Sequence, residues 1–208
     1  MTREERVPLE ALRAFSCAAE AGGATALSVP EAPDSPMLNR VVGLGVERRA
    51  TEADVDEALA AIGAGVTFYV AVAPGARPVE LLEWLRARGL EPGWGWMTFR
   101  RGVEGPPSAE TSLRLLEVDS AVEPAAFGRV VRVSYGLPAA IEPRLARVCE
   151  SGWLCWLAFD GDEPAGGGAL YAAEGVAYLS LRGPSPSTGV RERRTPSCSR
   201  RASSVATS

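Results

Sequence analysis

The strongest constraint on the fold is a run of seven apolar residues, Trp153 to Phe159, with no polar side chain at either alternate position. A strand that is apolar on both faces is expected in the middle of a sheet. The run ends at Asp160-Gly161-Asp162, a hairpin-turn sequence, and further strands are expected at Gly167–Tyr171 and Val176–Leu181. The sequence therefore predicts a three-stranded antiparallel meander.

The folding pattern stops at Leu181, within this sheet. Residues 182–208 are rich in Ser and Arg and have neither helical nor strand periodicity. Such a segment cannot bury enough apolar surface to offset its ordering entropy, so a disordered tail is expected. A sheet seldom ends on an unpartnered strand, because the open edge invites pairing with other chains. A frameshift is therefore considered beside a genuine solvated tail.

The genetic code offers a test of the frameshift. The chain has no Lys and is rich in Ala, Gly and Pro, which suggests a gene rich in G and C. When the codons of Ser180 to Ala202 are read from the third base of each codon, G/C-rich choices can spell Thr-Leu-Pro-Glu-His-Arg-Gly-Lys-Gly-Ala-Gln-Asn-Ala-Leu and then an apolar, Ala-rich helix. Because this is folding sequence, we favour a frameshift, which the nucleotide sequence across Leu179–Arg182 tests.

Composition excludes several classes of protein. With 46% hydrophobic and 23% charged residues the chain is globular, and its net charge of -4 lacks the basic field of a nucleic-acid binder. The charged start, Met1–Arg6, is unlike a signal peptide, and no stretch approaches the roughly 20 apolar residues of a membrane helix. A cytoplasmic protein with no membrane or nucleic-acid partner is expected.

Metal sites are not expected either. The chain has no His, and its four cysteines show no CxxC spacing, so they are expected to be buried free thiols. Without His, acid–base chemistry would fall to Glu, Asp, Tyr, Cys, a chain terminus or water. The cysteines are Cys17, Cys149, Cys155 and Cys198.

The remaining periodicities predict an α/β (α+β) fold with mixed sheets flanked by helices. The expected order is a first module at 1–101, a linker at 102–112, a second module at 113–181 and the tail at 182–208. In the first module we expect helices at Leu9–Glu20, from Thr51 (capped with Asp54) and from Pro78 to Gly89, and strands at Arg40–Val46, Val66–Ala73 and Gly95–Arg100. In the second we expect a strand at Leu113–Val118 and helices from Pro124 and near Ile141–Val148, before the meander.

The order strand, helix, helix, meander in Leu113–Leu181 resembles the front half of a GNAT-type N-acetyltransferase domain. Glu123–Arg132 is similar to the first helix of such domains, and Gly167–Tyr171 with Gly175–Leu179 is similar to the hairpin before their cofactor loop. That loop, Arg/Gln-x-x-Gly-x-Gly/Ala, cradles the pyrophosphate of acetyl-CoA at a helix N-terminus. The shifted reading places Arg-Gly-Lys-Gly-Ala there, so the tail would replace the loop itself.

The resemblance implies that acetyl-CoA is the co-substrate and that a small-molecule or peptide amine attacks its thioester. Backbone groups of Tyr178, Leu179, Ser180 and Leu181 would hold the pantetheine and polarise the carbonyl. Residues 1–101 resemble the back half of a second, degenerate module. There Gly43–Ala50 occupies the loop position without its Gly spacing, and Glu47 would repel phosphate, so a structural role is expected.

No catalytic residue is assigned. Glu163, Glu174 or Glu142 could act as general base, although solvated carboxylates are common at such turns and helix starts. The Tyr that usually serves as general acid in the family, on the helix beyond the cofactor loop, has no counterpart here. Trp153 and Trp156 could line an acceptor pocket or belong to the core. The alternatives are a non-catalytic binding module, or an Arg-rich tail that contacts nucleic acid. The tail arginines are Arg191, Arg193, Arg194, Arg200 and Arg201. The acceptor and the oligomeric state stay open.

Overall fold

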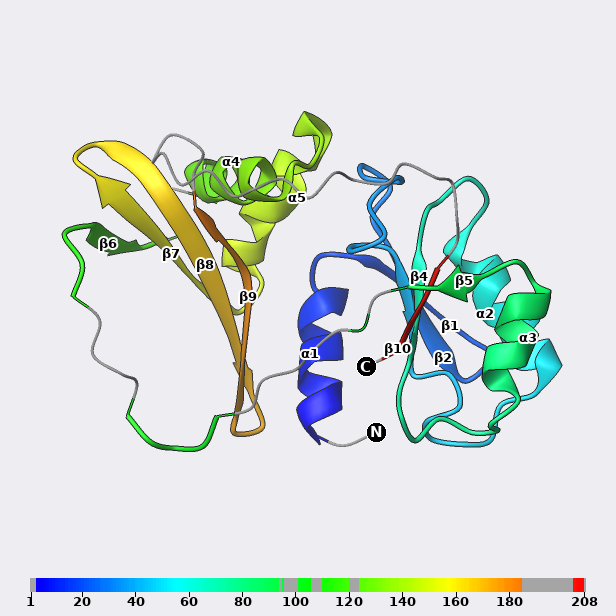
Figure 1. The fold of residues 1–208 in the computed structure, drawn as a ribbon. Coiled ribbons are helices and arrows are strands. Elements are labelled where there is room, and N and C mark those ends of the chain that lie inside the picture. The colour runs from blue at the N-terminus through cyan, green and yellow to red at the C-terminus, as the bar shows by residue number, and fades with distance from the viewer. Residues whose placement is uncertain are drawn as a thin grey trace. The chain divides into compact units, whose positions relative to one another are not determined.

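The computed structural model describes residues 3–93, 95, 101–105, 110–119, 124–184 and 204–207 (Figure 1). The chain divides into two compact units, which we call unit 1 (residues 1–98 and 196–208) and unit 2 (residues 99–195). Each unit contains one sheet with helices packed on it, which confirms the expected α/β class with helix-flanked sheets. None of the helices in the described ranges has the length and apolar character needed to span a membrane.

Unit 1 is built on a mixed six-stranded sheet with the order β1-β2-β3-β4-β10-β5. Strands β1 to β3 pair antiparallel, whereas β3, β4, β10 and β5 run parallel. The elements in chain order are α1 (Arg3–Arg13), β1 (Cys17–Ala21), β2 (Ala24–Ser28), β3 (Arg40–Val42), α2 (Glu52–Ile62), β4 (Tyr69–Val72), α3 (Leu81–Ala87), β5 (Glu91–Pro92) and β10 (Ser204–Thr207).

Helices lie on both faces of this sheet. Figure 1 shows α2 and α3 together on one side of β2 and β4, with α1 on the other. The core between the sheet and α2 contains Val41 and Val70 from the strands and Val55 from the helix, each fully buried. The β3-α2-β4-α3 order confirms the element order expected from the sequence.

Two helices of unit 1 have boundaries that differ from the sequence prediction. The helix expected at Leu9–Glu20 ends at Arg13, because Cys17–Ala21 pairs with Ala24–Ser28 as a hairpin. The Gly22-Gly23 turn between them, at φ values of 58° and 69°, adopts the left-handed conformation that favours glycine. The helix expected from Pro78 starts at Leu81. The strand expected at Gly95–Arg100 lies outside the described residues except for Gly95.

Unit 2 is built on a four-stranded antiparallel sheet with the order β6-β7-β8-β9. Its elements follow the expected order: β6 (Arg114–Glu117), α4 (Pro124–Tyr135), the 3-10 turn η1 (Ala139–Ile141), α5 (Glu142–Ala146), the 3-10 turn η2 (Arg147–Glu150), β7 (Trp153–Asp160), β8 (Glu163–Ala173) and β9 (Val176–Pro184). The central position predicted for Trp153–Phe159 is confirmed, since β7 lies between β6 and β8.

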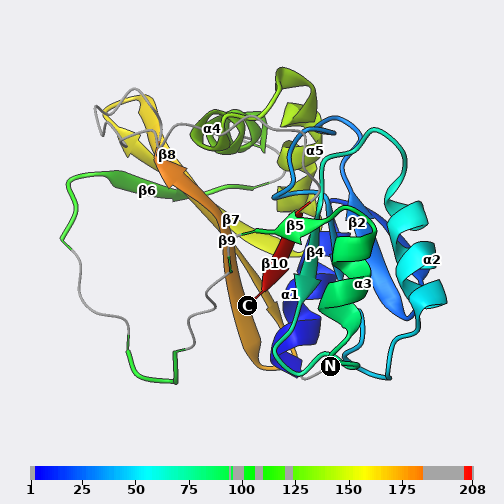
Figure 2. The same ribbon diagram turned by 45° about the vertical axis from the view of Figure 1, so that its right-hand side comes forward.

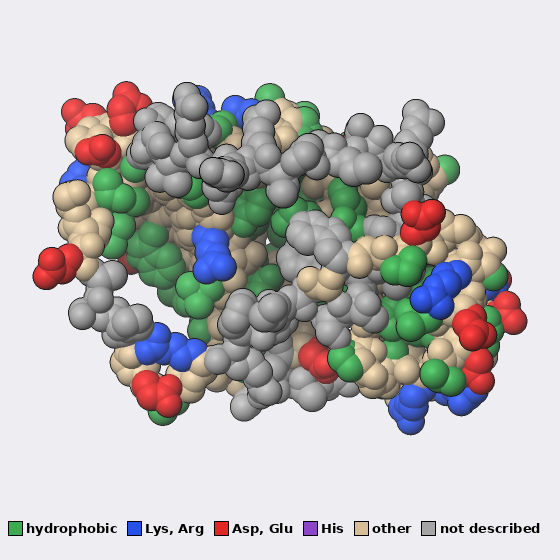
Figure 3. Space-filling model, viewed as in Figure 1, with side chains coloured by type: hydrophobic (Ala, Val, Ile, Leu, Met, Phe, Trp, Pro, Cys, Tyr) green, Lys and Arg blue, Asp and Glu red, His purple; other side chains and the backbone are tan. Residues whose placement is uncertain are grey.

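Only one face of the unit 2 sheet is covered by helices in the described chain. Helices α4 and α5 lie on the same side of the sheet (Figures 1 and 2), and every second residue of β7 from Trp153 to Phe159 is buried. The central position does not bury both faces of β7, because Leu154 on the other face is 44% exposed. Leu154 pairs with Leu170, and Leu170 pairs with Leu179, so a leucine row crosses the open face. Figure 3 shows hydrophobic side chains gathered over these strands.

The sheet continues beyond the point where the sequence pattern stops. Strand β9 runs to Pro184, where Gly183 and Pro184 pair with Gly167 and Gly166. Residues 204–207 form β10 in unit 1, so the expectation of a tail without any element is wrong for these four residues. The rest of the tail, 185–203 and Ser208, lies outside the described residues.

Candidate functional site

Strand β9 is interrupted by a one-residue bulge. Gly167 of β8 pairs with Gly183, whereas Ala169 pairs with Ser180, so β9 has one residue more than β8 between these two pairs. Leu181 lies in the bulge at φ 51°, and its side chain is buried. A bulge breaks the ladder and redirects the backbone. It therefore coincides with the end of the segment proposed from sequence as the pantetheine-holding strand.

The last turn of α4 holds β9 just beyond the bulge. The Ser134 hydroxyl lies 2.7 Å from the Pro184 carbonyl oxygen and 2.8 Å from that of Val130. The Tyr135 hydroxyl is hydrogen bonded to the backbone of Arg182. Burial raises the pKa of Tyr135 above its usual value, and the charge of Arg182 together with this backbone contact opposes that rise. Together these contacts tie the helix to the bulged end of the strand.

The contact between α4 and β9 depends on a glycine. A Cβ atom added to Gly183 would lie 2.4 Å from Ser134 Cβ and 2.6 Å from its Oγ, which no real packing allows. Gly168, on β8 beside the bulge, has room for a Cβ, whose nearest neighbour would be Arg182 Cβ at 3.8 Å. Gly183 is therefore needed for close approach, whereas Gly168 is not.

The four residues proposed from sequence as cofactor-binding lie along β9 in different surroundings. Tyr178 lies on the helix-covered face, where its ring meets Trp153 edge-to-face with 6.1 Å between the ring centroids. Leu179 points to the open face and is 70% exposed, Ser180 is half-buried and pairs with Ala169, and Leu181 is buried. A shared role for the four would therefore be carried by their backbone, and it stays a prediction.

The structure does not bring the three candidate bases together. Glu163 is the first residue of β8 and Glu174 follows its last, and the eleven residues of this strand span roughly 35 Å. Glu174 lies in the β8–β9 turn at φ 49°. Glu142 is half-buried and forms an ion pair with Arg132, with 2.5 Å between Oε1 and Nε, so its carboxylate is already engaged. The pair is Coulombic rather than an aligned hydrogen bond, because the Arg132 Nε–H has no hydrogen-bond acceptor.

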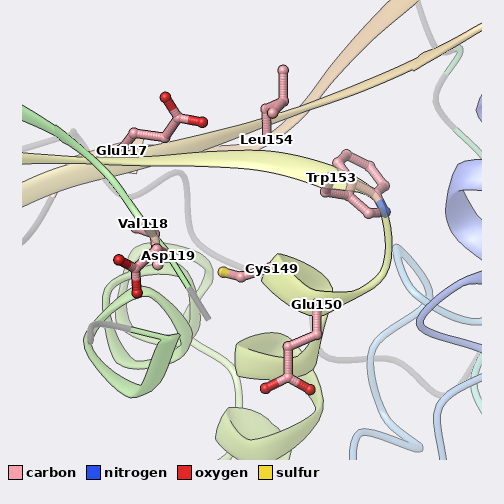
Figure 4. Close-up of a pocket in the computed structure, with 7 residues that line it drawn as sticks. All are labelled: Glu117, Val118, Asp119, Cys149, Glu150, Trp153 and Leu154. Carbon is pink, nitrogen blue, oxygen red and sulfur yellow. The ribbon is translucent and has the colours of Figure 1, made fainter. Parts of the chain in front are cut away.

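An open pocket of about 560 Å³ lies at the β6–η2–β7 corner of unit 2 (Figure 4). Trp153 lines it, whereas Trp156 does not, so only one of the two tryptophans proposed for an acceptor pocket is found there. No residue of β9 contributes to the lining. The lining residues are Glu117, Val118, Asp119, Cys149, Glu150, Trp153 and Leu154.

In unit 1, the loop Gly43–Ala50 that was compared with the family's cofactor loop leads to a helix start capped by the chain's own side chains. Thr51 and Asp54 form a reciprocal capping box at the start of α2, which confirms the predicted cap. Both carboxylate oxygens of Asp54 accept from the Arg48 guanidinium, at 2.6 and 2.7 Å. The hydrogen bonds from Arg48 and Thr51 hold the pKa of Asp54 well below its usual value. This helix N-terminus is therefore already neutralised.

In the described part of the chain, no group of three or more His, Cys, Asp or Glu side chains is arranged to hold a metal ion.

Ser134 and Tyr135 were not predicted from the sequence as partners of β9. Their spacing from β9, 50 residues between Ser134 and Pro184, leaves no local signal from which the contact could be predicted.

No family model and no curated protein sequence matches this chain. A solved structure named GCN5-related N-acetyltransferase, from Kribbella flavida, is similar over 94% of this chain and 76% of its own, with a TM-score of 0.50 and 21% identity. A structure from Pyrococcus horikoshii that is described as an acetyltransferase is similar over 44% of this chain, with a TM-score of 0.33 and 17% identity. The chain spans about a third of the length of that protein, 34%. The first likeness confirms the GNAT-type fold expected from the sequence.

Proposed function

We propose that unit 2 is the acetyl-CoA-binding half of an N-acetyltransferase that transfers an acetyl group to the amine of a small molecule or peptide. The GNAT-type fold supports the proposal, and the bulge at Leu181 in β9 is the observation that carries it. A bulged edge strand offers backbone N–H groups that the sheet ladder does not use. Within the described chain, β9 is the outermost strand of its sheet on one side.

Acetyl-CoA fits this strand, as substrate, through its pantetheine and thioester. Tyr178, Leu179, Ser180 and Leu181 would hold it by backbone hydrogen bonds, with a free N–H aimed at the thioester oxygen. The amine nitrogen forms a bond to the acetyl carbon, the C–S bond breaks, and the thiolate takes up a proton as the amine loses one. The contacts of Ser134 and Tyr135 with Pro184 and Arg182 would keep the strand in the conformation that this requires.

The pyrophosphate half of the site belongs to the same proposal. We propose that the loop for it is encoded in the shifted frame after β9, so that the chain as written binds acetyl-CoA poorly. The capped α2 in unit 1 offers no substitute, because Asp54 would repel an anion at that helix N-terminus. The cytoplasmic location expected from the sequence stays part of this proposal.

Acetyl-CoA binding to the chain as written and to the frame-restored chain tests the proposal. We expect no change in Tm for the chain as written. For the frame-restored chain, preferential binding to the folded state should stabilise by about 2.7 kcal/mol when acetyl-CoA is present at a hundredfold excess over Kd. A frame-restored chain that folds but shows no shift would contradict the proposal and favour a non-catalytic binding module.

A matched pair of variants at Leu181 tests the backbone role in the frame-restored chain. Leu181→Gly keeps the positive φ and the N–H, whereas Leu181→Pro cannot adopt φ 51° and has no N–H. We expect the Gly variant to bind acetyl-CoA in calorimetry and the Pro variant to lose binding, with circular dichroism as the check that both fold. Equal binding by the two folded variants would show that the bulge holds no part of the substrate.

A further inference from the structure

Cys149 and Cys155 of unit 2 form a pair of interacting thiols. Cys149 lies on η2 and Cys155 on β7, and their side chains are hydrogen bonded to each other. Neither is in a disulfide. Cys155 is buried under the helices, whereas Cys149 is half-buried and lines the open pocket. One thiol of the pair therefore lines an open pocket, and its partner is buried.

Figure 4 shows Cys149 in the middle of the lining residues, with its sulfur pointing toward Val118 and Asp119. Glu117 and Leu154 point to the opposite side of β7 from Cys149, and Cys149 itself lines the open pocket. The Cys149 sulfur therefore has an approach from the pocket, as attack on a small molecule requires.

The hydrogen bond makes the two thiols unequal. The contact with Cys155 lowers the pKa of the Cys149 thiol, and this effect exceeds the opposing effects of burial and of the Glu150 charge. The same contact, together with burial, raises the pKa of the Cys155 thiol. Cys149 is thus the member of the pair that forms a thiolate, with Cys155 as the donor that stabilises it.

The charges near Cys149 select among the molecules that can reach it. Glu150, its neighbour in sequence, is exposed, and Asp119 lines the same pocket on the side toward which the sulfur points. Both are acidic, and the described lining contains no Arg. An anionic molecule is therefore repelled and a cationic molecule is attracted, over distances of about 10 Å at moderate salt.

We propose that Cys149 and Cys155 are a thiol-exchange site for small cationic disulfides, with Cys149 as the attacking thiol and Cys155 as the resolving thiol. In the first step the Cys149 thiolate forms a bond to one sulfur of the disulfide, whose S–S bond breaks and releases one thiolate. In the second, the Cys155 sulfur loses its proton as it attacks the Cys149 sulfur, the bond between Cys149 and the small molecule breaks, and the second small thiolate leaves. The protein pair is oxidised by two electrons, the small disulfide is reduced, and the two protein protons end on the released thiols.

The product disulfide would join η2 to β7 through a closed segment of the chain from Cys149 to Cys155. This would fix the 3-10 turn η2 against the sheet and remove the only half-buried thiol from the described pocket lining. The site does not depend on acetyl-CoA, since it lies two strands away from β9.

The experiment uses the full chain with Cys17 and Cys198 replaced by Ser, so that only the pair remains. After exposure to cystamine, a cationic disulfide, intact mass spectrometry should show a loss of two hydrogens and no retained adduct. The same chain with Cys155→Ala should instead retain a single cysteamine adduct on Cys149. With Cys149→Ser it should stay unmodified, because Cys155 is buried. A retained adduct on the pair, or an unmodified Cys155→Ala variant that is folded by circular dichroism, would overturn the assignment.

Charge selection is tested by the rate. Cystamine should oxidise the pair roughly fivefold faster than oxidised glutathione, which is anionic, and the difference should shrink at 1 M salt, where charges are screened within about 3 Å. The Glu150→Gln variant should reduce the preference at low salt. Equal rates for the two disulfides at low salt would overturn the preference for cations. A wild-type Cys17, tested in a Cys149→Ser chain, serves as the exposed reference thiol and should react more slowly than Cys149.

Discussion

The two units differ at comparable positions, namely the segment after β3 in unit 1 and the segment at β9 in unit 2. In unit 1 the segment after β3 leads into α2, and the helix start is closed by Thr51, Asp54 and Arg48. In unit 2 the corresponding segment follows β9. This edge strand is bulged at Leu181, and Ser134 at the end of α4 is hydrogen bonded to it at Pro184. A closed cap stabilises a fold but leaves no donor for a ligand, whereas a bulged edge keeps backbone donors available. The closed cap fits a structural role for unit 1, and the bulged edge fits the substrate-binding role proposed for unit 2.

The largest expected effect comes from a substitution beside the capped start of α2 in unit 1. Gly22→Ala in unit 1 puts a Cβ 2.0 Å from the backbone oxygen of Asp54, at φ 58°. We expect a loss of about 3 kcal/mol or more, since backbone overlap and a left-handed φ add. Gly43→Ala, also at positive φ but with no atom within 4 Å, should cost only about 1 kcal/mol. Hydrogen exchange by mass spectrometry can locate the loss in unit 1, and similar losses for the two variants would contradict the close approach.

The next effect tests the contact between α4 and β9 in unit 2. Gly183→Ala should destabilise unit 2 by about 2 kcal/mol, because the new methyl group overlaps Ser134. Adding Ser134→Gly should recover part of the loss in denaturant unfolding, since it removes the Cβ that is overlapped. Gly168→Ala, with 3.8 Å to its nearest neighbour, is the matched control. A Gly183→Ala chain as stable as this control would contradict the close approach of Ser134 to Gly183.

A smaller effect concerns the acid stability of unit 1. Because Arg48 and Thr51 hold the pKa of Asp54 below its usual value, its contribution is complete above pH 4 and is lost as pH falls through the depressed pKa. Asp54→Asn should therefore lower Tm at pH 7, and the difference from the natural sequence should shrink as pH falls below about 4. Asp162→Asn, an exposed carboxylate in the β7–β8 turn, is the control. A difference in Tm that stays constant from pH 7 to pH 2 would contradict the ion pair.

The smallest effect is expected on the open face of the unit 2 sheet, and it is compared with a substitution on the helix-covered face. Leu179 lies on the open face of β9 and is 70% exposed. Leu179→Asn should therefore change the free energy of unfolding by no more than about 0.5 kcal/mol. Leu157→Ala on the covered face, where the side chain is fully buried, should cost about 2–5 kcal/mol. Chemical denaturation of both variants measures the contrast. Comparable losses would show that the leucine row is buried in solution.

Much of this fold could be predicted from local patterns. The capping box at Thr51, the helix with Phe127 buried, and the three strands of the meander all appear where the sequence places them. The hairpin at Cys17–Ala21 could not be predicted, because its Ala-rich strands also fit a helical period. Pairing with a neighbouring strand, rather than propensity, decided between the two.

The candidate site was predicted only in part. Its strand follows from the sequence, since residues 176–181 are a clear third strand, but its extension to Pro184 does not. Gly183 and Pro184 have little strand propensity of their own and are held by β8 and by Ser134. A segment of this kind is stabilised by partners that a local pattern does not contain.

By itself, the sequence determined the order of the elements, the capped helix in unit 1 and the resemblance of unit 2 to an N-acetyltransferase domain. These depend on side-chain period and turn residues within a few positions of one another. Only the tertiary structure decided that β9 is bulged at Leu181, that α4 touches Gly183, and that Cys149 meets Cys155. Each of these depends on which face a residue presents after packing, which the distant partner, and not the local sequence, fixes.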